Sequence, residues 1–558
     1  MRSLSQSVGK PPRIISALVN NWKSVCILGP TIAVLILAFI ILPGYNEPTR
    51  VSENALLPAL VTENFAYQQR IIGFAKELNL QKDRNAYVAR KLRKYGILPH
   101  YQRFQINLLP NTNATKSNVF GQIYASRSAS VEAILVAVSI EDSIEAISTS
   151  LALATYCREQ IYWARNLIFV FVDGGVIGMK AFLASYYGEE ASGNFYYDHI
   201  DSQGGAIIGA FIIKTTGSSF RTLNIEYNML NGQLPNLDLI NLVVRLADKF
   251  DVIPTIYNSG RQYFWSDIAK TVAKGIFTQA FVSTEGLHSV FGSYGIQAVT
   301  IHAKGSTGHL TLGNLAKICE GMLRSLNNII ERFHQSYFLY ILPNPRRFIS
   351  VAYYMPIIGF MILPFIVLAL REWTLMESLS LPNAFIIYHI IGLFCYIYGK
   401  FITEHLLSIG SYFHLIFLLV PYYKFLPRAL EPNSSGKFFM FLELALVIGL
   451  KTPLVIFFSN FVFTLESAKS SMSYCLFFFS RLRWLREVLG FIVHPMVLFL
   501  LIRSQFLSQA ETLTETLHST ANFIAYSYLF NDIGFHLLQI CLIPLWSILL
   551  HYTSTSVV

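Results

Sequence analysis

Hydrophobic positions along the chain follow two patterns. Long apolar runs without charged residues occur toward both ends, and between Tyr45 and Arg347 short apolar runs alternate with stretches of helical periodicity. The first long run, Val25 to Leu42, is long enough to span a bilayer core. Four basic residues and no acidic residue precede it. The positive-inside rule therefore predicts a cytosolic N-terminus and a lumenal segment after the run.

A cleaved signal peptide is the alternative for this first run. The run begins late, is long for the apolar part of a signal peptide and lacks a clear small-residue cleavage site, which favours an uncleaved anchor. The two patterns predict cytosolic residues 1–24, a transmembrane signal anchor at 25–42, a lumenal domain at 43–349 and a C-terminal membrane domain at 350–558.

The segment between the apolar ends has the pattern of an α/β domain. Short apolar runs predict buried strands, and the longer stretches between them predict helices. The strands are Leu135–Ser139, Leu167–Val172, Ala206–Ile213 and Ala298–His302, and the helices are Ile144–Cys157, Val176–Tyr187 and Leu237–Phe250. This alternation predicts a mixed, mostly parallel sheet with helices on both faces.

Six further hydrophobic segments follow Arg347 in quick succession. With the first run they predict about seven transmembrane helices: the added segments are about Ser350–Leu370, Ala384–Phe401, Leu406–Leu426, Phe438–Leu465, Val488–Ile502 and Gly534–Leu550. The basic loop that carries Lys424 and Lys437 fits the cytosolic side that this count gives it. The loop from Arg481 to Arg486 is also basic, although the count places it in the lumen, and its topology stays open.

A long helix with an apolar stripe is predicted from Leu310 to Ile341, running into the second membrane span. Its aromatic end, residues 337–340, fits a membrane interface.

Composition supports a membrane protein. Hydrophobic residues make up 53% of the chain, charged residues 14%, and the mean hydropathy is +0.45. The net charge of +10 is dispersed, with no basic stripe of the kind that binds nucleic acid. The six cysteines lack CxxC spacing. Whether Cys157 and Cys319 pair is left open.

Few residues of the α/β segment carry a pattern typical of catalysis. Neither HExxH nor GxSxG occurs in the sequence. His199 and Asp201 have the spacing of a metal-ligand pair on an extended segment. Their polar surroundings before Gly204-Gly205 favour a solvated loop instead.

The order of elements resembles the M28 family of zinc aminopeptidases, which carry a His-x-Asp after an early strand, then a Glu-Glu pair, a further acid and a late histidine. This sequence has Glu141-Asp142 at the first place and Asp173-Gly174-Gly175 at the second. Lys214 lies near the third place, and His302 and His309 are late remnants.

These departures bear on activity. Loss of the acid pair removes a metal ligand and the general base that activates water. Asp142, Asp173 and His309 could still hold an ion weakly, but we expect structural roles, no catalytic residue and no cofactor.

Two features of the membrane segments suggest function. Lys451 lies within a hydrophobic segment two turns after Glu443, so a lipid phosphate or a neighbouring subunit is one reading, and a break in the helix near Pro453 is the other. The last segment contains Pro544 and Trp546, and the proline frees a backbone carbonyl within the membrane.

Four stretches resemble the glycosylphosphatidylinositol (GPI) anchor attachment protein family, a subunit family of GPI transamidase. The stretches are Gln160–Arg165, Leu230–Leu239, Glu331–Tyr340 and Tyr354–Pro356. The resemblance extends over nearly the whole chain, including the arrangement of one span, a large domain and several further spans.

The resemblance implies a multi-pass protein of the endoplasmic reticulum membrane that helps attach GPI anchors to protein C-termini. It implies a caspase-like catalytic subunit as partner, with GPI lipid and a proprotein as substrates, and a terminal span, with Pro544 and Trp546, that helps recognise GPI. The chain itself would be non-nucleophilic and position the substrates. An active M28-type zinc metallopeptidase of the same membrane is the alternative.

Two N-glycosylation motifs test the predicted topology. Asn113, in Asn113-Ala114-Thr115, is expected to carry a glycan because it is placed in the lumen, and Asn433 is expected to stay bare on the cytosolic side. Glycosidase-sensitive mobility of Asn113→Gln and Asn433→Gln variants measures this. A glycan on Asn433 would show that the span count is wrong.

Overall fold

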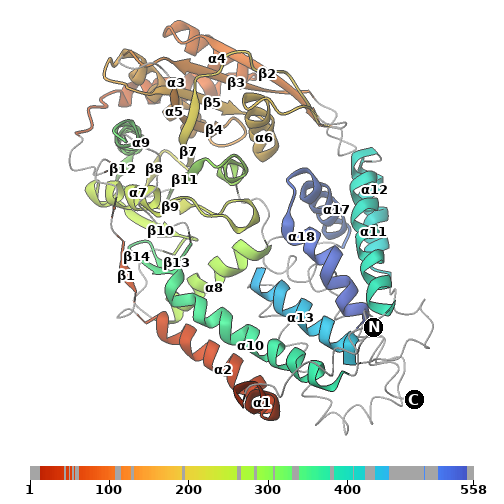
Figure 1. Ribbon diagram of the computed structural model, residues 1–558. Coiled ribbons are helices and arrows are strands. Elements are labelled where there is room, and N and C mark those ends of the chain that lie inside the picture. The colour runs from red at the N-terminus through yellow and green to blue at the C-terminus, as the bar shows by residue number, and fades with distance from the viewer. Residues whose placement is uncertain are drawn as a thin grey trace. The chain divides into compact units, whose positions relative to one another are not determined.

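The structure is a computed structural model of the chain (Figure 1). It describes residues 13–42, 46–49, 51–52, 56, 62–106, 115–126, 131–191, 195–259, 265–281, 286–305, 308–329, 339–376, 383–405, 407–420, 434–450, 496 and 513–548. The chain forms two compact units. One unit is Ile41–Val351, and the other combines Met1–Ile40 with Ala352–Val558.

A nine-stranded sheet forms the centre of the unit Ile41–Val351. Its strand order is β10-β9-β11-β7-β4-β5-β3-β2-β6. The strands are β2 (Pro99–Ile106), β3 (Lys116–Ile123), β4 (Glu132–Ser139), β5 (Asn166–Val172), β6 (Phe195–Tyr197), β7 (Ala206–Thr215), β9 (Thr222–Glu226), β10 (Ile253–Ile256) and β11 (Gln297–Lys304). Strand β5 is buried along its whole length, as is β4 after Glu132. Both read as continuous apolar runs because layers cover both faces of the sheet.

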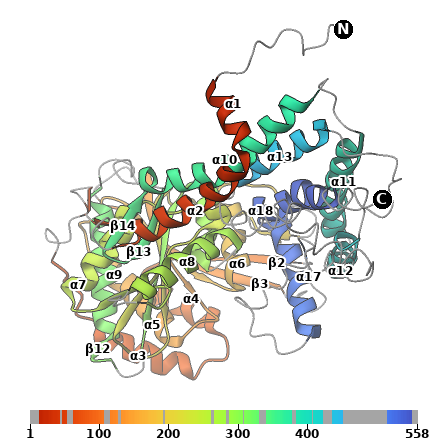
Figure 2. The ribbon, with the colours of Figure 1, turned by 90° about the horizontal axis from the view of Figure 1, so that it is seen from below.

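Helices cover both faces of this sheet (Figures 1 and 2). One layer holds α3 (Gln68–Asn79), α4 (Arg84–Lys94), α5 (Ile144–Glu159), α7 (Leu237–Lys249) and α9 (Leu312–Asn327). The other face carries α6 (Gly175–Tyr186) and the 3-10 segment η5 (Leu287–Tyr294). Helix α8 (Trp265–Phe281) packs against β13 (Tyr340–Asn344). The predicted α/β architecture is therefore confirmed.

The sequence predicted a mixed, mostly parallel sheet, and the sheet is mixed but only half parallel. Four of the eight neighbouring pairs are parallel, and they join β10 to β9, β11 to β7, β7 to β4 and β4 to β5. The other four are antiparallel, three of them on the side of β3, β2 and β6. Strand β2 mixes polar and apolar residues, so its pattern gave no strand prediction.

The predicted helix from Leu310 to Ile341 is confirmed in its first part and wrong in its length. Helix α9 ends at Asn327, and Tyr340 belongs to β13, which pairs with β14 (Arg347–Ser350). The Tyr340 side chain is buried and its hydroxyl donates to the Pro235 carbonyl, so it does not face a membrane interface. Residues 331–338 lie outside the described part.

Two of the four family-like stretches stabilise the fold. The Trp163 indole donates to the Cys157 carbonyl at the end of α5, and the Arg165 guanidinium donates to the Leu326 and Asn327 carbonyls at the end of α9. Asn236 caps the first turn of α7 by accepting from the Asp238 amide. These contacts satisfy backbone groups that helix ends leave unpaired.

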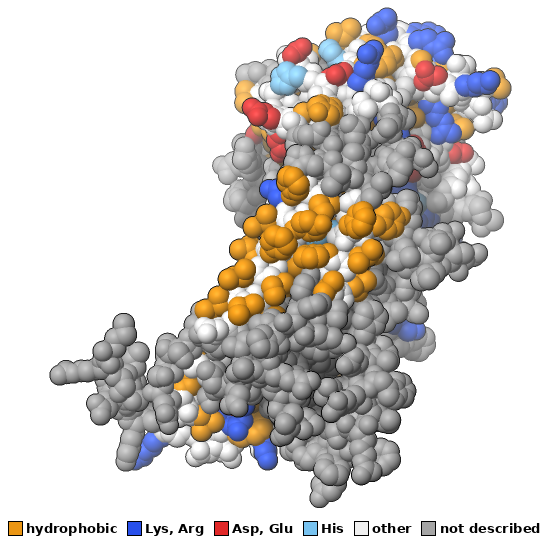
Figure 3. Space-filling view, turned by 90° about the vertical axis from the view of Figure 1, so that its right-hand side faces the viewer, with side chains coloured by type: hydrophobic (Ala, Val, Ile, Leu, Met, Phe, Trp, Pro, Cys, Tyr) orange, Lys and Arg blue, Asp and Glu red, His pale blue; other side chains and the backbone are white. Residues whose placement is uncertain are grey.

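The second unit is helical. Its main helices are α2 (Trp22–Ile40), α10 (Val351–Leu375), α11 (Asn383–His405), α12 (Leu407–Leu418), α13 (Ser434–Leu450), α17 (Leu513–Leu529) and α18 (Ile533–Leu537), which continues into the π-helical turn η7 (Leu538–Leu542). Helix α11 presents a stripe of exposed hydrophobic side chains (Figure 3), namely Ile390, Leu393, Phe394, Ile397 and Phe401. An exposed apolar stripe of this kind indicates a surface for contact with a membrane or another protein.

The described residues contain three helices long and apolar enough to cross a membrane, or four if a bent pair is one span. The three are Trp22–Ile40, Val351–Leu375 and Phe385–Ile402, and the bent pair, Thr520–Leu529 with Ile533–Ile548, turns by 105°. Seven spans are therefore not shown. Helix α12 ends at Leu418. Of the predicted span at 438–465 the structure describes only the part within α13, and of the predicted span at 488–502 it describes only Met496.

Both lumenally predicted cysteines that the sequence left open, Cys157 and Cys319, are buried free thiols.

Replacing Glu320 by Ala is expected to destabilise the protein. Its carboxylate is fully buried and accepts from the Asn64 and Phe65 amides and the Tyr156 hydroxyl. Its loss leaves these donors unpaired, at a cost of about 3 kcal/mol. Thermal unfolding of the full-length protein measures the effect. Glu190→Ala, at an exposed position, is the control, and an equal midpoint for the two variants would refute the role of Glu320.

Candidate functional site

The carboxyl ends of the central parallel strands form the candidate site. Strand β4 pairs with β5 on one side and β7 on the other, so the chain reverses its winding direction at β4. In α/β sheets ligands bind outside the carboxyl ends of strands at such a point. Glu141 and Asp142 follow β4, Asp173 follows β5, and Lys214 lies near the end of β7.

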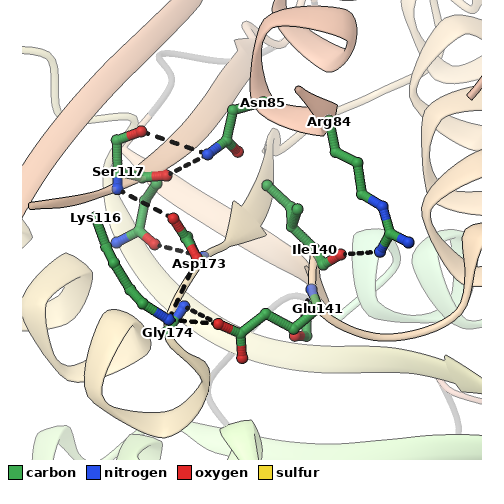
Figure 4. Close-up of polar contacts among 10 residues, drawn as sticks. Arg84, Asn85, Lys116, Ser117, Ile140, Glu141, Asp173 and Gly174 are labelled. Carbon is green, nitrogen blue, oxygen red and sulfur yellow. Dashed lines mark hydrogen bonds and ion pairs between the residues drawn. The ribbon is translucent and has the colours of Figure 1, made fainter. Parts of the chain in front are cut away.

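Lys116 brings the first two strand ends together (Figure 4). Strand β3 runs antiparallel to β5, so its first residue lies at the end of β5. The Lys116 ammonium lies 2.5 Å from a Glu141 oxygen and 3.7 Å from an Asp173 oxygen. The Gly174 amide donates to the same Glu141 oxygen at 3.2 Å, and the Ser117 amide donates to Asp173 at 3.3 Å. One cation therefore joins two carboxylates.

Helix α4 holds the loop after β4 in place. Arg84, at the first position of α4, donates to the Ile140 carbonyl at 2.6 Å and to the Asp142 carbonyl at 3.2 Å (Figure 4). The next residue, Asn85, donates to the Ser117 carbonyl at 3.1 Å. The beginning of α4 thus fixes the backbone on both sides of the ion pairs.

The turn after β5 contains Gly174 in a conformation that favours glycine. Its φ is +72°, a left-handed conformation that glycine adopts without strain. A Cβ at this position would lie 2.9 Å from Lys116 Cδ and 3.1 Å from Phe104 Cζ. A side chain at 174 would therefore require the Lys116 stem to shift, in addition to the backbone strain.

Electrostatics favour the charged lysine. Burial lowers the pKa of Lys116, but the hydrogen bond and charge of Glu141 and the charge of Asp173 outweigh it, so the pKa is raised above its usual value. Burial raises the pKa of the Asp142 carboxyl, although the charges of Lys214 and His302 oppose the shift. The charges that act on Asp142 include those of Lys214, His302 and Glu226, which belong to the second polar group of the site.

That second polar group lies on β7, β9 and β11. His302 is opposite Lys214 on β7 and Asn224 on β9. Its Nδ1 lies 2.8 Å from a carboxylate oxygen of Glu226, which identifies Nδ1 as the donor. Burial raises the pKa of Glu226, but the hydrogen bond from His302 and the charge of Lys214 lower it below the usual value.

His288 on η5 packs over the same face of the sheet. Its Nδ1 is 2.9 Å from the Thr300 hydroxyl, and burial lowers its pKa to about 4. The imidazole is therefore neutral near pH 7.

The residues predicted from the M28 resemblance are not brought together as a metal site. Asp173 is held by Lys116, and His309 is exposed. Among the residues that the structure describes, no group of three or more His, Cys, Asp or Glu side chains could hold a metal ion. His199 and Asp201 lie exposed on a loop.

Sequence reasoning missed Lys116, Arg84 and Glu226. Lys116 begins a strand in which polar residues and Gly121 interrupt the apolar positions, so the sequence carried no clear signal for it. The pattern also did not predict that β3 pairs antiparallel with β5, which places Lys116 beside Asp173.

The membrane candidates lie partly within the described residues. Pro544 and Trp546 are buried in the helical unit. A Cβ on Gly392 of α11 would lie 2.6 Å from Pro544 Cγ, so α11 approaches the proline closely. Glu443 pairs with His389 of α11 at 2.9 Å. Lys451 and Asn113 lie outside the described residues.

These features define a membrane protein with an α/β unit whose strand-end acids are engaged by a lysine. A family model described as "Gaa1-like, GPI transamidase component" matches residues 115–550, and the chain belongs to this family. The resemblance read from the four sequence stretches is thereby confirmed.

Two curated relatives support the assignment. The chain is 28% identical to the GPI transamidase component GAA1 of Saccharomyces cerevisiae over 371 residues, which cover 62% of this chain and 56% of that protein. It is 27% identical to GPI transamidase component gaa1 of Schizosaccharomyces pombe over 487 residues, 82% of this chain and 77% of that protein.

Some solved structures are similar over about half of the chain. They include Porphyromonas gingivalis glutaminyl cyclase, with 15% identity, 47% of this chain and 98% of that chain covered, and a TM-score of 0.29. The LapA aminopeptidase of Legionella pneumophila has 12% identity, covers 51% and 76%, and has a TM-score of 0.32. The relation to M28 peptidases stays a prediction.

Glu226 is expected to stabilise the folded protein in a pH-dependent way. Its pKa is lowered in the fold, so its contribution is present above the unfolded pKa of about 4.3 and is lost as the pH falls through the lower folded value. Glu226→Ala should cost about 2 kcal/mol at neutral pH, because His302 loses its charged acceptor.

Thermal unfolding between pH 7 and pH 3 measures this contribution against Glu190→Ala. The difference between wild type and Glu226→Ala should shrink toward acid. A difference that stays constant with pH would contradict the lowered pKa of Glu226 in the fold.

Proposed function

We propose that this chain is the non-nucleophilic subunit of the GPI transamidase complex of the endoplasmic reticulum membrane, where it binds and presents GPI lipid and proprotein. The observation that carries the proposal is the match of the Gaa1-like family model to residues 115–550, which include most of both units. The thiol nucleophile then belongs to a caspase-like partner subunit, and this chain contributes by positioning.

The strand-end site supports a non-catalytic role for the α/β unit. Water activation by zinc requires carboxylates that are free to bind metal and a carboxylate base. Here the Lys116 ammonium engages Glu141 and Asp173, and Gly174 has no side chain that could act as base. These contacts do not favour the alternative of an active metallopeptidase.

The helical unit supports a role in lipid recognition. We propose that the last helical segment, with Pro544 and Trp546, contributes to GPI binding together with Lys451. Proline has no amide hydrogen, so residue 544 cannot donate to the carbonyl of Ile540, four residues earlier in the helix. Helix α11 approaches this turn closely at Gly392. A side chain there would meet the Gln539 and Ile540 carbonyl oxygens, so the close approach depends on glycine.

The endoplasmic reticulum membrane is proposed from the family, and the topology from charge and hydropathy along the sequence. The N-terminus would be cytosolic, the unit Ile41–Val351 lumenal and the helical unit embedded in the membrane, in contact with other transamidase subunits.

Expression in cells depleted of their own Gaa1-like component tests the function. The chain should restore surface display of a GPI-anchored reporter, and the Asp142→Ala/Asp173→Ala double variant should restore it nearly as well, because neither carboxylate acts in chemistry. Reporter display is measured by flow cytometry, and co-purification of the other subunits is the control for assembly.

Two results would contradict this proposal. If the wild-type chain assembles with the other subunits but does not restore reporter display, the proposed transamidase function is wrong. Abolished display by the double variant within a normally assembled complex would instead assign chemistry to the strand-end acids.

A further inference from the structure

The second polar group of the candidate site contains a buried histidine nitrogen without a partner. His302 Nδ1 donates to Glu226, and the His302 side chain is only 6% exposed. Its Nε2 is buried and has no hydrogen-bond partner among the residues that the structure describes. A buried polar atom without a partner has lost its hydration without compensation. The atom therefore indicates that a water molecule or a ligand completes this group.

The unpartnered nitrogen points toward β7. Strand β11 lies between β9 and β7, and Glu226, which accepts from Nδ1, is on β9. The two nitrogens of an imidazole ring point in widely different directions, so Nε2 points away from Glu226. Lys214 of β7 is directly opposite His302 in the parallel register, on the same face of the sheet. The nitrogen is thus directed to the side on which Lys214 lies.

Lys214 has no bonded partner either. The residue is half-buried, and its ammonium makes no hydrogen bond or ion pair with the part of the chain that the structure describes. Its charge nevertheless acts on Asp142, Glu226 and His288. The ammonium therefore lies among the polar side chains at the strand ends, where it remains available to a ligand.

Two further lysines lie at the same place. Lys304 is two residues after His302, on the same face of β11, and its ammonium donates to Asn258 Oδ1 at 2.5 Å. Lys274 of α8 lies 5.9 Å from the centre of the Tyr257 ring, which directly precedes Asn258. Three separate elements, β7, β11 and α8, thus bring lysines to one end of the sheet.

These lysines are close enough to repel one another. Burial lowers the pKa of Lys304, the charge of Glu226 opposes this shift, and the charges of Lys214 and Lys274 add to it. Glu226 is already bonded to His302. A bound anion would offset the repulsion between the ammonium groups, whereas a water molecule would not.

We propose that Lys214, Lys304 and the Nε2 atom of His302 bind a phosphate group, with Lys274 adding positive charge at the edge of the site. The inference concerns the α/β unit alone and does not depend on the proposed transamidase function.

The chemistry of these groups suits phosphate. Lysine ammonium groups bind phosphate oxygens through charge-assisted hydrogen bonds. Nε2 can accept from a protonated phosphate oxygen when the ring is neutral and donate to phosphate when the ring is charged. Lys214 and Lys304 lie at the carboxyl ends of two parallel strands, and ligands of α/β sheets bind outside such ends. A free phosphate ion and the phosphate of a lipid headgroup share this chemistry.

Phosphorus NMR of the full-length protein in a phosphate-free detergent tests the proposal. Inorganic phosphate and O-phosphoethanolamine are the two probes, and broadening of their resonances measures binding. The wild type should bind at least one probe. Lys214→Met should weaken this binding about tenfold or more, because it removes a charge-assisted hydrogen bond and keeps the apolar stem. Lys304→Met should also weaken it and serves as a second variant if Lys214→Met is poorly folded.

Lys91→Met is the matched control. It removes the same charge from the same unit, but Lys91 is engaged by Glu77 at 2.5 Å, away from the site. Its binding should equal that of the wild type at constant ionic strength. Lys214→Arg keeps the charge and should keep the binding.

The probes also identify the source of the phosphate group. Binding of inorganic phosphate alone supports a site for the free ion, binding of O-phosphoethanolamine alone supports a site for a headgroup, and binding of both supports a site for the phosphate group itself. The proposal is wrong if the wild type binds neither probe, or if folded Lys214→Met and Lys304→Met bind as tightly as Lys91→Met. It is also wrong if acetate competes as well as phosphate. None of these results depends on whether the chain restores GPI attachment.

Discussion

Burial of the central strands on both faces is the constraint on which the α/β unit depends. Every residue of β5, and every residue of β4 after Glu132, is enclosed by the two helical layers. A charged side chain within these strands would lose its hydration without compensation. The chain can therefore place charges only where the strands end, and the acids at 141, 142 and 173 occupy those ends. The location of the candidate site follows from packing before any chemistry is considered.

The sequence predicted the elements whose pattern is local. Strands β4, β5, β7 and β11 and helices α5, α6 and α7 were found because their apolar periodicity lies within one segment. Strand β2 was missed because its polar residues interrupt the pattern. Helix α9 was extended too far because apolar residues continue at helical spacing beyond it. Its end depends on Arg165, distant in sequence, which donates to its last carbonyls.

The candidate site was predictable only in part for a similar reason. The predicted strands end at or just before four polar residues, which could therefore be identified one by one as candidates: Asp142, Asp173, Lys214 and His302. Lys116 comes from a strand that the pattern did not reveal, and antiparallel pairing with β5 decides its partner. Likewise, Glu226 reaches His302 only because β9 runs antiparallel to β11. Pairing between strands is a tertiary property, so the sequence gives the side chains but not their partners.

The contact between Gly174 and Lys116 also restricts the order in which mutations can accumulate. A side chain at 174 would meet the lysine stem before it could contribute a new carboxylate. An acidic residue introduced at 174 would require residue 116 to shorten or move, and loss of the ammonium would leave Glu141 and Asp173 without their shared cation. A side chain at 174 is therefore sterically coupled to the lysine at 116, whereas a shorter residue at 116 remains compatible with Gly174.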